Sequence, residues 1–381
     1  MKHNNCLIRG TTFIILVLLL QNAAFSQRIE NIDGVRTVIN EKTATIDIDN
    51  NDYLKFIRKI GDLESSDENQ MFYKPSDIAL DDEGNIYIMD TGNFKVKKFN
   101  SEGEFILSFG NRGEGPGEFL QSVSIEVNND GNIVVLDKTN QRFEVFSKKG
   151  IRISDFKFEK MPSLFKINST GEYVVHGRSV ITLPVIGSGK RPDDMGDESI
   201  LQICKKDGLR LRELGVSEEF GNPISNIRIN SVEFDVDKGD NVFLSYTYKN
   251  LIEKYSSEGI LLLKITRPLN YPITKQEKKS IESYLEEMLK NKVMINTVST
   301  GIAVDDQDNI WVITLNRQKK EAEEDLIQTD MYDLEIIDKN GVLQGKIHLD
   351  HYADDIEIFG DRLFILDRNN SMCFYEYKIL N

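Results

Sequence analysis

Two consecutive segments of this chain repeat one pattern of short apolar runs separated by turns. The first, residues 75–109, reads PSDIALDDEGNIYIMDTGNFKVKKFNSEGEFILSF, and the second, residues 122–157, reads SVSIEVNNDGNIVVLDKTNQRFEVFSKKGIRISDFK. Each contains four runs of strand length, and Gly, Asn and Asp, which favour tight turns, fill the gaps. Four antiparallel strands in about 45 residues form one blade of a β-propeller, so the repeat predicts that fold.

Four less regular copies of the pattern follow, each recognised by a turn and the strand after it. Together with the two clear copies they make six. Because stacked repeats bury a continuous core, we expect six blades of four strands each. The four anchors are Gly171–Val174, Asp240–Phe243, Asp308–Trp311 and Asp361–Phe364.

The last copy lacks its fourth strand, and a matching strand stands near the other end of the chain. The copy ends with Cys373–Ile379, while residues 53–61 match residues 104–110, the outer strand of the first copy. We therefore predict an all-β, six-bladed β-propeller of four-stranded antiparallel blades over residues 53–381, closed by an N-terminal strand that completes the last blade. Such closure leaves only short, protected edges. Residues 27–52 are either a leader or an extra strand.

The glycine-rich stretch GNRGEGPGEF, residues 110–119, links two of these blades. A phosphate-binding loop would need a lysine after its last glycine and a helix behind it. Here Glu118 and Phe119 come next and a strand follows, and Glu114 and Glu118 would repel phosphate. The stretch therefore predicts a tight corner between blades rather than a nucleotide site.

The first copy also resembles a known repeat. Its sequence over residues 75–99, with the motif DxxGN followed by IYIMD and NxKVKKF, is similar to the NHL repeat. The loop Gly-Glu-Gly-Pro-Gly-Glu-Phe resembles that of exported bacterial six-bladed propeller proteins. The resemblance is strongest over residues 72–157 and covers most of the chain after residue 26. It implies a six-bladed propeller but no single activity, because this fold serves lyases, lactonases and plain binding proteins.

Residues 1–26 have the features of a secretory signal peptide. Lys2 and Arg9 flank the start of an apolar run from Phe13 to Leu20, and residues 24–26, Ala-Phe-Ser, have the form of a cleavage site. The run is too short to span a bilayer comfortably, and a retained membrane anchor is the alternative. We expect no transmembrane segment after cleavage, and export to the periplasm, the cell envelope or the exterior.

Charge and cysteine content limit the choice of partners. The chain holds 47 Lys and Arg against 62 Asp and Glu, and removal of residues 1–26, with two basic and no acidic residues, leaves a net charge of −17. Nucleic acids and anionic lipids need basic patches that neutralise phosphate, so we expect neither as a partner. The negative charge suits cations or basic partners, or it serves solubility alone. Cys204 and Cys373 either form a disulfide or stay as buried thiols.

Loop lengths distinguish the two faces of the predicted disc. The turns on one face are short in every copy, whereas the long insertions fall on the other, which we call the long-loop face. Function tends to lie on loops that a rigid scaffold holds. This face is therefore the expected binding face, with Arg112, Glu114 and His176 as candidate ligand contacts. The alternative is that the insertions have no function. The insertions are residues 178–199, 215–230, 268–299 and 316–330.

One insertion contains the clear helix of the sequence, at about residues 274–292. Thr274 and Glu277 fit a capping box at its start. We expect this helix to lie across the rim, or to act as a lid or a docking helix. Its apolar face, at helical spacing, comprises Ile281, Tyr284, Leu285 and Met288.

The inner strands supply candidate metal ligands. Three carboxylates, Asp77, Glu233 and Asp355, could hold a hard cation such as Ca²⁺, which prefers oxygen ligands. The resemblance agrees, because some six-bladed propeller hydrolases hold a metal there with Glu, Asn and Asp. A solvated acidic rim is the alternative. Alignment of the copies places one residue of each blade at this level near the channel mouth: Asp77, Ser124, Leu164, Glu233, Gly301 and Asp355.

Histidines offer a second metal candidate. Residues 348–355, HLDHYADD, include His348 and His351, and a transition metal such as Zn²⁺ is conceivable there. Amidating lyases with similar repeats use a zinc site with several histidines, whereas this chain has one further histidine after residue 26, His176. Ordinary surface and rim histidines are the alternative.

Three aspartates that end second strands recur at equivalent places, each followed three residues later by Asn: Asp90, Asp137 and Asp367. Because Asx side chains close turns on their own backbone, we expect these to be structural.

These observations favour a non-catalytic recognition protein that binds a protein, peptide or glycan on the long-loop face. The alternative is a metal-assisted lyase or hydrolase at the channel mouth on the same face, although no nucleophile motif is present. The enzyme needs a bound cation and converging carboxylates, whereas the binding protein needs an apolar or aromatic patch on its loops. Residues 182–186, TLPVI, are one candidate patch.

Overall fold

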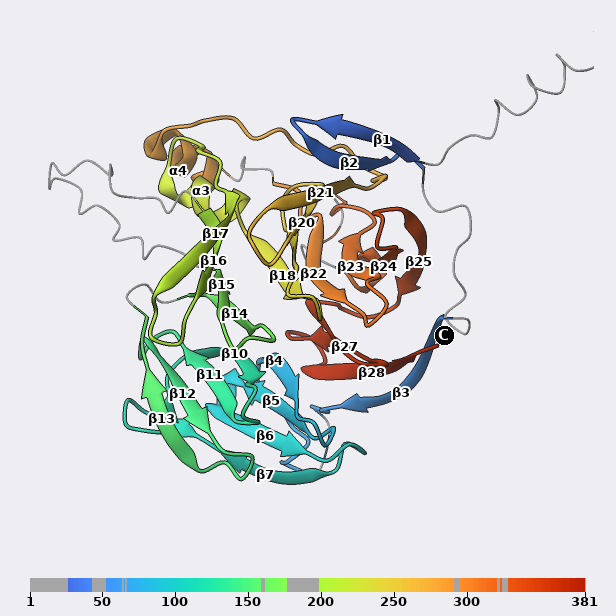
Figure 1. Ribbon diagram of the computed structural model, residues 1–381. Coiled ribbons are helices and arrows are strands. Elements are labelled where there is room, and N and C mark those ends of the chain that lie inside the picture. The colour runs from blue at the N-terminus through green and yellow to red at the C-terminus, as the bar shows by residue number, and fades with distance from the viewer. Residues whose placement is uncertain are drawn as a thin grey trace, which may run out of the picture.

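Six β-sheets surround a common axis in the computed structural model of the chain (Figure 1). The chain is a six-bladed β-propeller, as its repeats predict. The structure describes residues 27–42, 53–63, 65, 67–158, 162–176, 199–290, 295–320, 323 and 328–380. The expected signal peptide and the candidate patch at residues 182–186 lie outside these ranges.

The first three blades are four-stranded antiparallel sheets whose strands run in sequence order from the axis to the rim. The first contains β4 (Pro75–Leu80), β5 (Ile86–Asp90), β6 (Lys95–Phe99) and β7 (Phe105–Phe109). The second contains β10 (Ser122–Val127), β11 (Ile133–Asp137), β12 (Arg142–Phe146) and β13 (Arg152–Phe156). The third contains β14 (Leu164–Ile167), β15 (Tyr173–His176), β16 (Ser199–Cys204) and β17 (Arg210–Val216).

The remaining blades follow the same order around the ring. The fourth contains β18 (Val232–Val236), β19 (Val242–Tyr246), β20 (Ile252–Tyr255) and β21 (Leu261–Thr266). The fifth contains β22 (Ser299–Val304), β23 (Ile310–Leu315), β24 (Tyr332–Ile337) and β25 (Leu343–Leu349). The sixth contains β26 (Asp355–Phe359), β27 (Arg362–Asp367), β28 (Cys373–Ile379) and, from the other end of the chain, β3 (Leu54–Ile60).

The pairing of β3 with β28 confirms the predicted closure. The two strands are antiparallel, with Ile60 opposite Phe374. Nε of Arg58 lies 2.7 Å from a carboxylate oxygen of Glu376, whose side chain is buried. Segments more than 300 residues apart in sequence therefore hold one blade together.

A hairpin of residues 27–40 extends the fourth blade to six strands. β1 (Gln27–Ile32) and β2 (Val35–Asn40) are joined by Asp33 and Gly34, whose φ angles are 52° and 83°. Two positive φ angles are typical of a type I′ turn. β2 pairs in parallel with β21. The side chain of Asn40 donates to the carbonyls of Thr266 and Gly341 at 3.1 Å, which anchors the hairpin between two blades.

The core lies between the blades rather than within one layer. A separate hydrophobic cluster fills each of the six interfaces between neighbouring blades. Because both faces of a blade are covered, strands near the middle are apolar throughout, and every residue of β5 and of β11 is buried. The outer strand β7 instead alternates between half-buried and exposed residues over most of its length, because it borders solvent.

The expected helix at residues 274–292 is shorter than predicted. α4 spans Ile281–Leu289, and its N-cap is Ser280, whose Oγ accepts from the N–H of Ser283 at 3.3 Å. The N–H of Thr274 donates instead to the side chain of Asn296 at 2.7 Å, which draws this residue away from a helical path. A second helix, α3 (Pro223–Ile229), lies in the link before β18 and was not expected.

Cys204 and Cys373 are buried free thiols, which decides between the two alternatives for them. Burial raises the pKa of Cys373 to about 12, so this thiol is unreactive at neutral pH. Of the helices that the structure describes, none is long and apolar enough to cross a membrane.

Candidate functional site on the long-loop face

The register of the inner strands places the aligned carboxylates at one level of the propeller. Asp77 lies opposite Met89 of its second strand, and Asp355 lies opposite Leu366 of its own. Glu233 holds the corresponding position in the fourth blade. The alignment of the sequence copies is therefore correct at these positions, although the surroundings of the three carboxylates differ.

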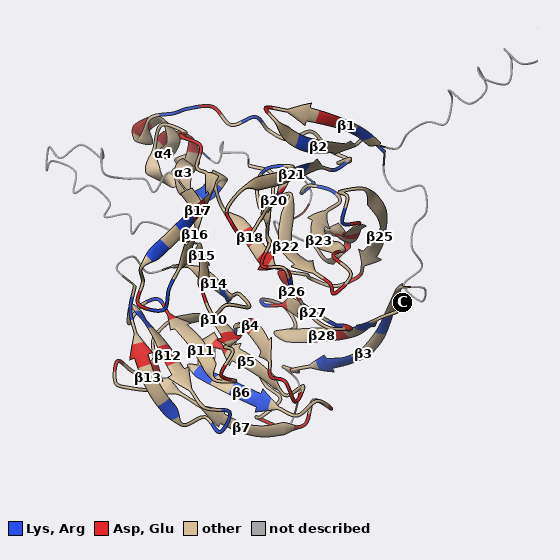
Figure 2. Ribbon diagram, viewed as in Figure 1, with Lys and Arg blue, Asp and Glu red and all other residues tan. Residues whose placement is uncertain are grey.

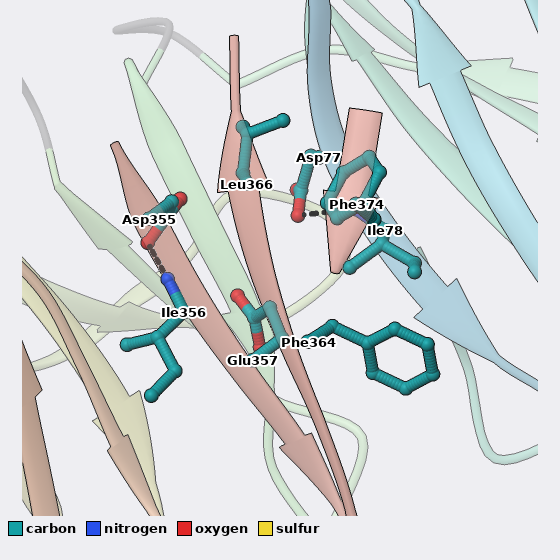
Figure 3. Close-up of a pocket in the computed structure, with 8 residues that line it drawn as sticks. All are labelled: Asp77, Ile78, Asp355, Ile356, Glu357, Phe364, Leu366 and Phe374. Carbon is teal, nitrogen blue, oxygen red and sulfur yellow. Dashed lines mark hydrogen bonds between the residues drawn. The ribbon is translucent and has the colours of Figure 1, made fainter. Parts of the chain in front are cut away.

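Asp77 and Asp355 line one narrow cavity between the first and sixth blades (Figure 3). The space between these side chains leaves no room for a water molecule. Glu357, two residues further along β26, lines the same cavity, whereas Glu233 does not. The structure thus brings two of the three predicted ligands together and leaves the third apart.

Asp77 joins two blades through its carboxylate. One oxygen accepts from the N–H of Ile78 at 2.8 Å, and the other accepts from the N–H of Ile125 in the second blade at 2.8 Å. Asp235 does the same between the fourth and fifth blades, accepting from Val236 at 2.8 Å and Val304 at 2.9 Å. These carboxylates hold neighbouring inner strands in register.

A lysine crosses the propeller axis at the next level. Nζ of Lys166 in the third blade lies 2.6 Å from both carboxylate oxygens of Glu357 in the sixth blade, and 3.3 Å from Glu126 in the second. The third and sixth blades are opposite each other in a ring of six. Charge-assisted hydrogen bonds of this length are strong ones. Lys166 therefore ties the two halves of the ring together.

Burial changes the protonation of this cluster. It raises the pKa of Glu126 to about 7 and that of Asp355 to about 7, and it also raises the pKa values of Asp77, Asp235 and Glu357. Burial alone would lower the pKa of Lys166, but the surrounding carboxylates, led by Glu357, raise it well above its usual value. The charged Lys166 thus lies among several carboxyl groups, and some of these carboxyl groups carry a proton near neutral pH.

Sequence reasoning missed Lys166, although a signal was present. Side chains two residues apart in a strand point to the same side of the sheet. The residues two positions after the aligned level therefore form a second level along the axis. In three blades this position is acidic and in one it is basic: Glu126, Lys166, Asp235 and Glu357.

The three histidines occupy separate environments. His351 is buried, with Nδ1 2.8 Å from the carbonyl of Tyr352 and Nε2 2.9 Å from the hydroxyl of Tyr377, and burial lowers its pKa. His348 lies on β25 with Nδ1 2.9 Å from Asp333. His176 is buried at the end of β15, 3.2 Å from Ser163 Oγ. The structure does not bring these rings together.

Among the residues that the structure describes, no group of three or more His, Cys, Asp and Glu side chains is placed to hold a metal ion. The Ca²⁺ and Zn²⁺ sites therefore stay predictions from the sequence.

The glycine-rich stretch forms a corner, as predicted. β8 (Asn111–Arg112) and β9 (Glu118–Phe119) pair in parallel, and a carboxylate oxygen of Glu118 accepts from the N–H of Gly115 at 2.8 Å. The candidate contacts Arg112 and Glu114 remain exposed on it. The guanidinium of Arg112 lies 5.4 Å from the ring centroid of Phe94.

The aspartates that end the second strands are structural, as predicted, and two of them also bind the link that enters their blade. Asp90 accepts from the Asn93 side chain at 2.7 Å, which closes the turn as expected. Its other oxygen accepts from the N–H of Tyr73 at 2.7 Å, in the link that enters the blade. Asp137 likewise accepts from Leu120 and Gln121 of the preceding link. Asp90 and Asp137 therefore each hold two loops of the long-loop face, whereas Asp367 accepts from the N–H of Asn370 at 2.9 Å within its own turn.

The two helices of this face lie next to each other beside β17 of the third blade, as Figure 1 shows. The side chain of Asn222, the N-cap of α3, donates to the carbonyl of Lys279 at 2.9 Å, and the N–H of Lys279 donates to the carbonyl of Phe220 at 2.9 Å. Tyr284 is the buried residue of α4 and lies beside Arg228 of α3. The helices form one platform above the blades.

Three apolar side chains of α4 are exposed to solvent. The exposed fractions of Leu285, Met288 and Leu289 are 37%, 46% and 84%. At spacings of three and four residues they form one stripe along the helix, which we call the α4 stripe. Glu282 and Glu286, both exposed, accompany it. An apolar patch of this kind on a loop insertion is the feature expected of a binding protein.

Comparisons with known proteins agree with the fold. Residues 26–174 match a protein family described as 6-bladed beta-propeller (DUF5128). A protein of Bacteroides fragilis NCTC 9343, assigned as exported, is 12% identical with a TM-score of 0.58, over 91% of this chain and 100% of that one. A DUF4221 family member from Bacteroides vulgatus ATCC 8482 is 10% identical with a TM-score of 0.57, over 87% and 100%. No curated protein matches the sequence.

A lyase is also among the similar structures. Virginiamycin B lyase from Staphylococcus aureus is 10% identical with a TM-score of 0.48, over 86% of this chain and 100% of that one. At such identity a structural likeness concerns the fold alone, and function has to be argued from the site. The propeller resemblance is confirmed, whereas the NHL label stays a prediction because the matching family is a different one.

Proposed function

We propose that the protein is an exported, non-catalytic recognition module that binds a protein or peptide on its long-loop face, with the α4 stripe as its main contact. The observation that carries the proposal is the exposure of Leu285, Met288 and Leu289 on a helix that is itself fixed to the scaffold. A rigid helix loses little conformational freedom on binding, which favours affinity.

The chemistry of the partner follows from the surroundings of the stripe. Leu285, Met288 and Leu289 favour apolar side chains, and Glu282 beside them favours basic ones, whereas Glu286 is paired with Lys290 of the same helix. The excess of acidic residues in the whole chain points the same way. The partner is therefore a segment that combines apolar anchors with Lys or Arg, docked on a helix face.

Peptide selection tests this function. Peptides selected on the immobilised protein should be enriched in apolar and basic residues, and the affinity of the best peptide is measured by fluorescence anisotropy. Replacement of Leu285, Met288 and Leu289 by Ser should weaken binding by at least about tenfold, because a few central side chains carry most of the binding energy of an interface. Ile153→Ser removes an exposed apolar side chain from β13, which lies well away from α4 in Figure 1, and is the matched control.

Equal affinity of the triple variant and the control would reject the α4 stripe as the contact. Selection of no peptide, together with retention of a glycan on an array, would replace the peptide by a glycan as the ligand of this face.

Metal-assisted lyase or hydrolase chemistry at the channel mouth is the second candidate. The observation in its favour is that Asp77 and Asp355 line one cavity and both have raised pKa values, a feature that is common among catalytic groups. A cation bound only by the folded state must raise the unfolding midpoint. EDTA should then lower the midpoint, and Ca²⁺ or Zn²⁺ should restore it in the native chain but not in the variant Asp77→Ala with Asp355→Ala.

A further inference from the structure

Among the strands that the structure describes, none pairs with the outer backbone edge of β1, the last strand of the fourth blade. β1 ends the six-stranded sheet, and within the described residues β2 is the strand that pairs with it. Figure 1 shows the hairpin of β1 and β2 at the rim of the disc, with β1 outermost in its sheet. A free edge of this kind can accept a strand from another chain.

The turn determines which backbone groups face this edge. In a two-residue hairpin the residues that flank the turn, here Ile32 and Val35, form a hydrogen-bonded pair. Such pairs recur at every second residue of an antiparallel ladder. The even-numbered residues of β1 therefore direct their N–H and C=O groups to β2. The groups of Ile29 and Asn31 point to the free edge.

The charges of β1 are complementary to those of a second β1. Arg28 and Glu30 lie on either side of Ile29, with side chains 58% and 39% exposed, and contact each other at 3.0 Å. Figure 2 shows these two charges on the outer strand. If two copies of β1 run antiparallel about a two-fold axis through Ile29, Arg28 of each copy faces Glu30 of the other. Opposite charges directly across a strand pair stabilise it.

We propose that β1 is a self-association edge, at which two copies of this chain pair antiparallel with Ile29 opposite Ile29 of the second copy. This register uses the outward N–H and C=O of Ile29 for the central hydrogen bonds. Arg28 and Glu30 of the second copy then form a non-hydrogen-bonded pair, in which side chains come closest. The interface is isologous and closed, as in most homodimers. The exposed Ile29, at 51%, becomes covered.

The other outer strands lack this complementarity. When two copies of a strand pair about a two-fold axis, a residue whose backbone groups face the edge lies opposite another such residue. A basic and an acidic residue can therefore lie opposite each other only if they are an even number of residues apart in the strand. In β13, Arg152 and Asp155 are three apart, and in β17, Glu213 is one or three residues from its arginines. β7 has no charged residue and β25 has no acidic one. β3 carries only basic charges, Lys55, Arg58 and Lys59, which would repel a second copy.

Sedimentation velocity over a wide range of protein concentration tests the proposal, with the full chain expressed in an exporting host. The native protein should dimerise reversibly. Arg28→Glu and Glu30→Arg each place like charges opposite one another, so each alone should raise the dimer dissociation constant by at least about tenfold. An equimolar mixture of the two variants restores opposite charges and should dimerise as the native protein does.

The equimolar mixture distinguishes a loss of charge pairing from a folding defect, because two misfolded variants would not dimerise when they are mixed. Both side chains are exposed, so each variant should also keep the native unfolding midpoint. Ile29→Pro removes an outward N–H and should abolish dimerisation without disturbing the pairing of β1 with β2. A native protein that stays monomeric at every concentration would overturn the proposal, and so would a dimer that both charge variants retain. These results do not depend on peptide binding at the α4 stripe.

Discussion

Lys166 is the residue on which the charge balance of the propeller axis depends. Its ammonium contacts Glu357 and Glu126 from two other blades. Removal of one partner of a buried ion pair leaves uncompensated charge, at a cost of about 3–5 kcal/mol. Lys166→Met should therefore lower the free energy of unfolding at pH 8 by about 3 kcal/mol, as measured by urea denaturation. The loss should be smaller at pH 5, where the carboxyl groups are protonated.

The matched control is Lys346→Met. Lys346 also pairs with a carboxylate, Asp333, at 2.9 Å, but it lies on the outer strand β25, where its side chain is more exposed. Because Asp333 keeps its hydrogen bond from the Asn316 side chain and its contact with His348 Nδ1, the loss of Lys346 should cost less, about 1 kcal/mol. Equal effects of the two substitutions would contradict the role of Lys166 as a link across the axis.

The raised pKa values predict how stability depends on pH. Glu126 and Asp355 have folded pKa values of about 7, above the usual 4.5 and 3.8. A raised pKa means that the folded state binds the proton more tightly. The resulting stability is fully present below the unfolded pKa and is lost as pH rises through about 7. The free energy of unfolding should therefore fall between pH 5 and pH 8, by up to about 1.4 kcal/mol per pH unit for each group.

Glu126→Gln removes one of the titrating groups and should make this fall shallower. Glu114→Gln, on the exposed corner, is the control and should leave the pH profile unchanged. A profile of Glu126→Gln that superimposes on that of the native chain would show that this carboxyl group is already ionised at pH 5.

For single residues, the sequence predicted where a side chain lies in its blade better than which side chains it contacts. The equivalent level of Asp77 and Asp355 was predictable, because the turns and strand lengths of the copies determine register. The environment of each carboxylate was not, because it depends on side chains from other blades, such as Lys166 at the opposite side of the ring. A single repeat does not contain that information.

Among the elements, the blade-to-blade corner depends on a glycine. Gly110 has a φ of 89°, and a Cβ there would lie 2.3 Å from the ring of Phe119, which is buried in the core. Gly360 has a φ of 64° and open space around it, so Gly360→Ala measures the cost of the backbone conformation without a clash. Gly110→Ala should lower the free energy of unfolding by about 1–3 kcal/mol more than Gly360→Ala does, because of the added clash.

Urea denaturation of both variants checks this prediction. Equal losses would mean that Phe119 moves aside at no cost and that the corner is not tightly packed. Gly61 repeats the arrangement with Phe72 in the link from the sixth blade to the first, so Gly61→Ala should behave like Gly110→Ala.

Helices were the elements that the sequence predicted least well. The residues Thr274 and Glu277 have the composition of a capping box, but the contact of Thr274 with Asn296 prevails over this local signal. α3 has only seven residues, too few for a periodic pattern. Strands were predictable because each one repeats in six blades, whereas each helix occurs once.

For the whole molecule, the closure by β3 has a measurable consequence. A chain that starts at Asp62 lacks β3, and it loses the buried side chains of Leu54 and Ile60 as well as the partner Arg58 of Glu376. Each buried apolar side chain contributes about 2–5 kcal/mol, so this chain should be less stable by at least about 4 kcal/mol. A chain that starts after the β1–β2 hairpin keeps β3 and is the control.

Thermal unfolding of both shortened chains gives the comparison. The chain without β3 should melt far below the control. Similar midpoints for the two would mean that the ring holds together without its closing strand, contrary to the pairing of β3 with β28.

The architecture of the whole molecule was predictable because closure, blade number and repeat length follow from self-similarity in the sequence. The activity was not, since the same ring supports different functions and the difference lies in insertions that do not repeat. The α4 stripe is an example, because its exposure follows from how Tyr284 packs and not from the apolar pattern alone.

Hydrogen–deuterium exchange of the full chain, with and without the best selected peptide, tests the central claim most directly. If the long-loop face recognises its partner through the α4 stripe, the amides of Ile281–Leu289 should exchange more slowly in the complex, and those of β4 and β26 beside the channel cavity should not change. Protection of β4 and β26 with no change in α4 would contradict the account and place the binding site at the channel mouth.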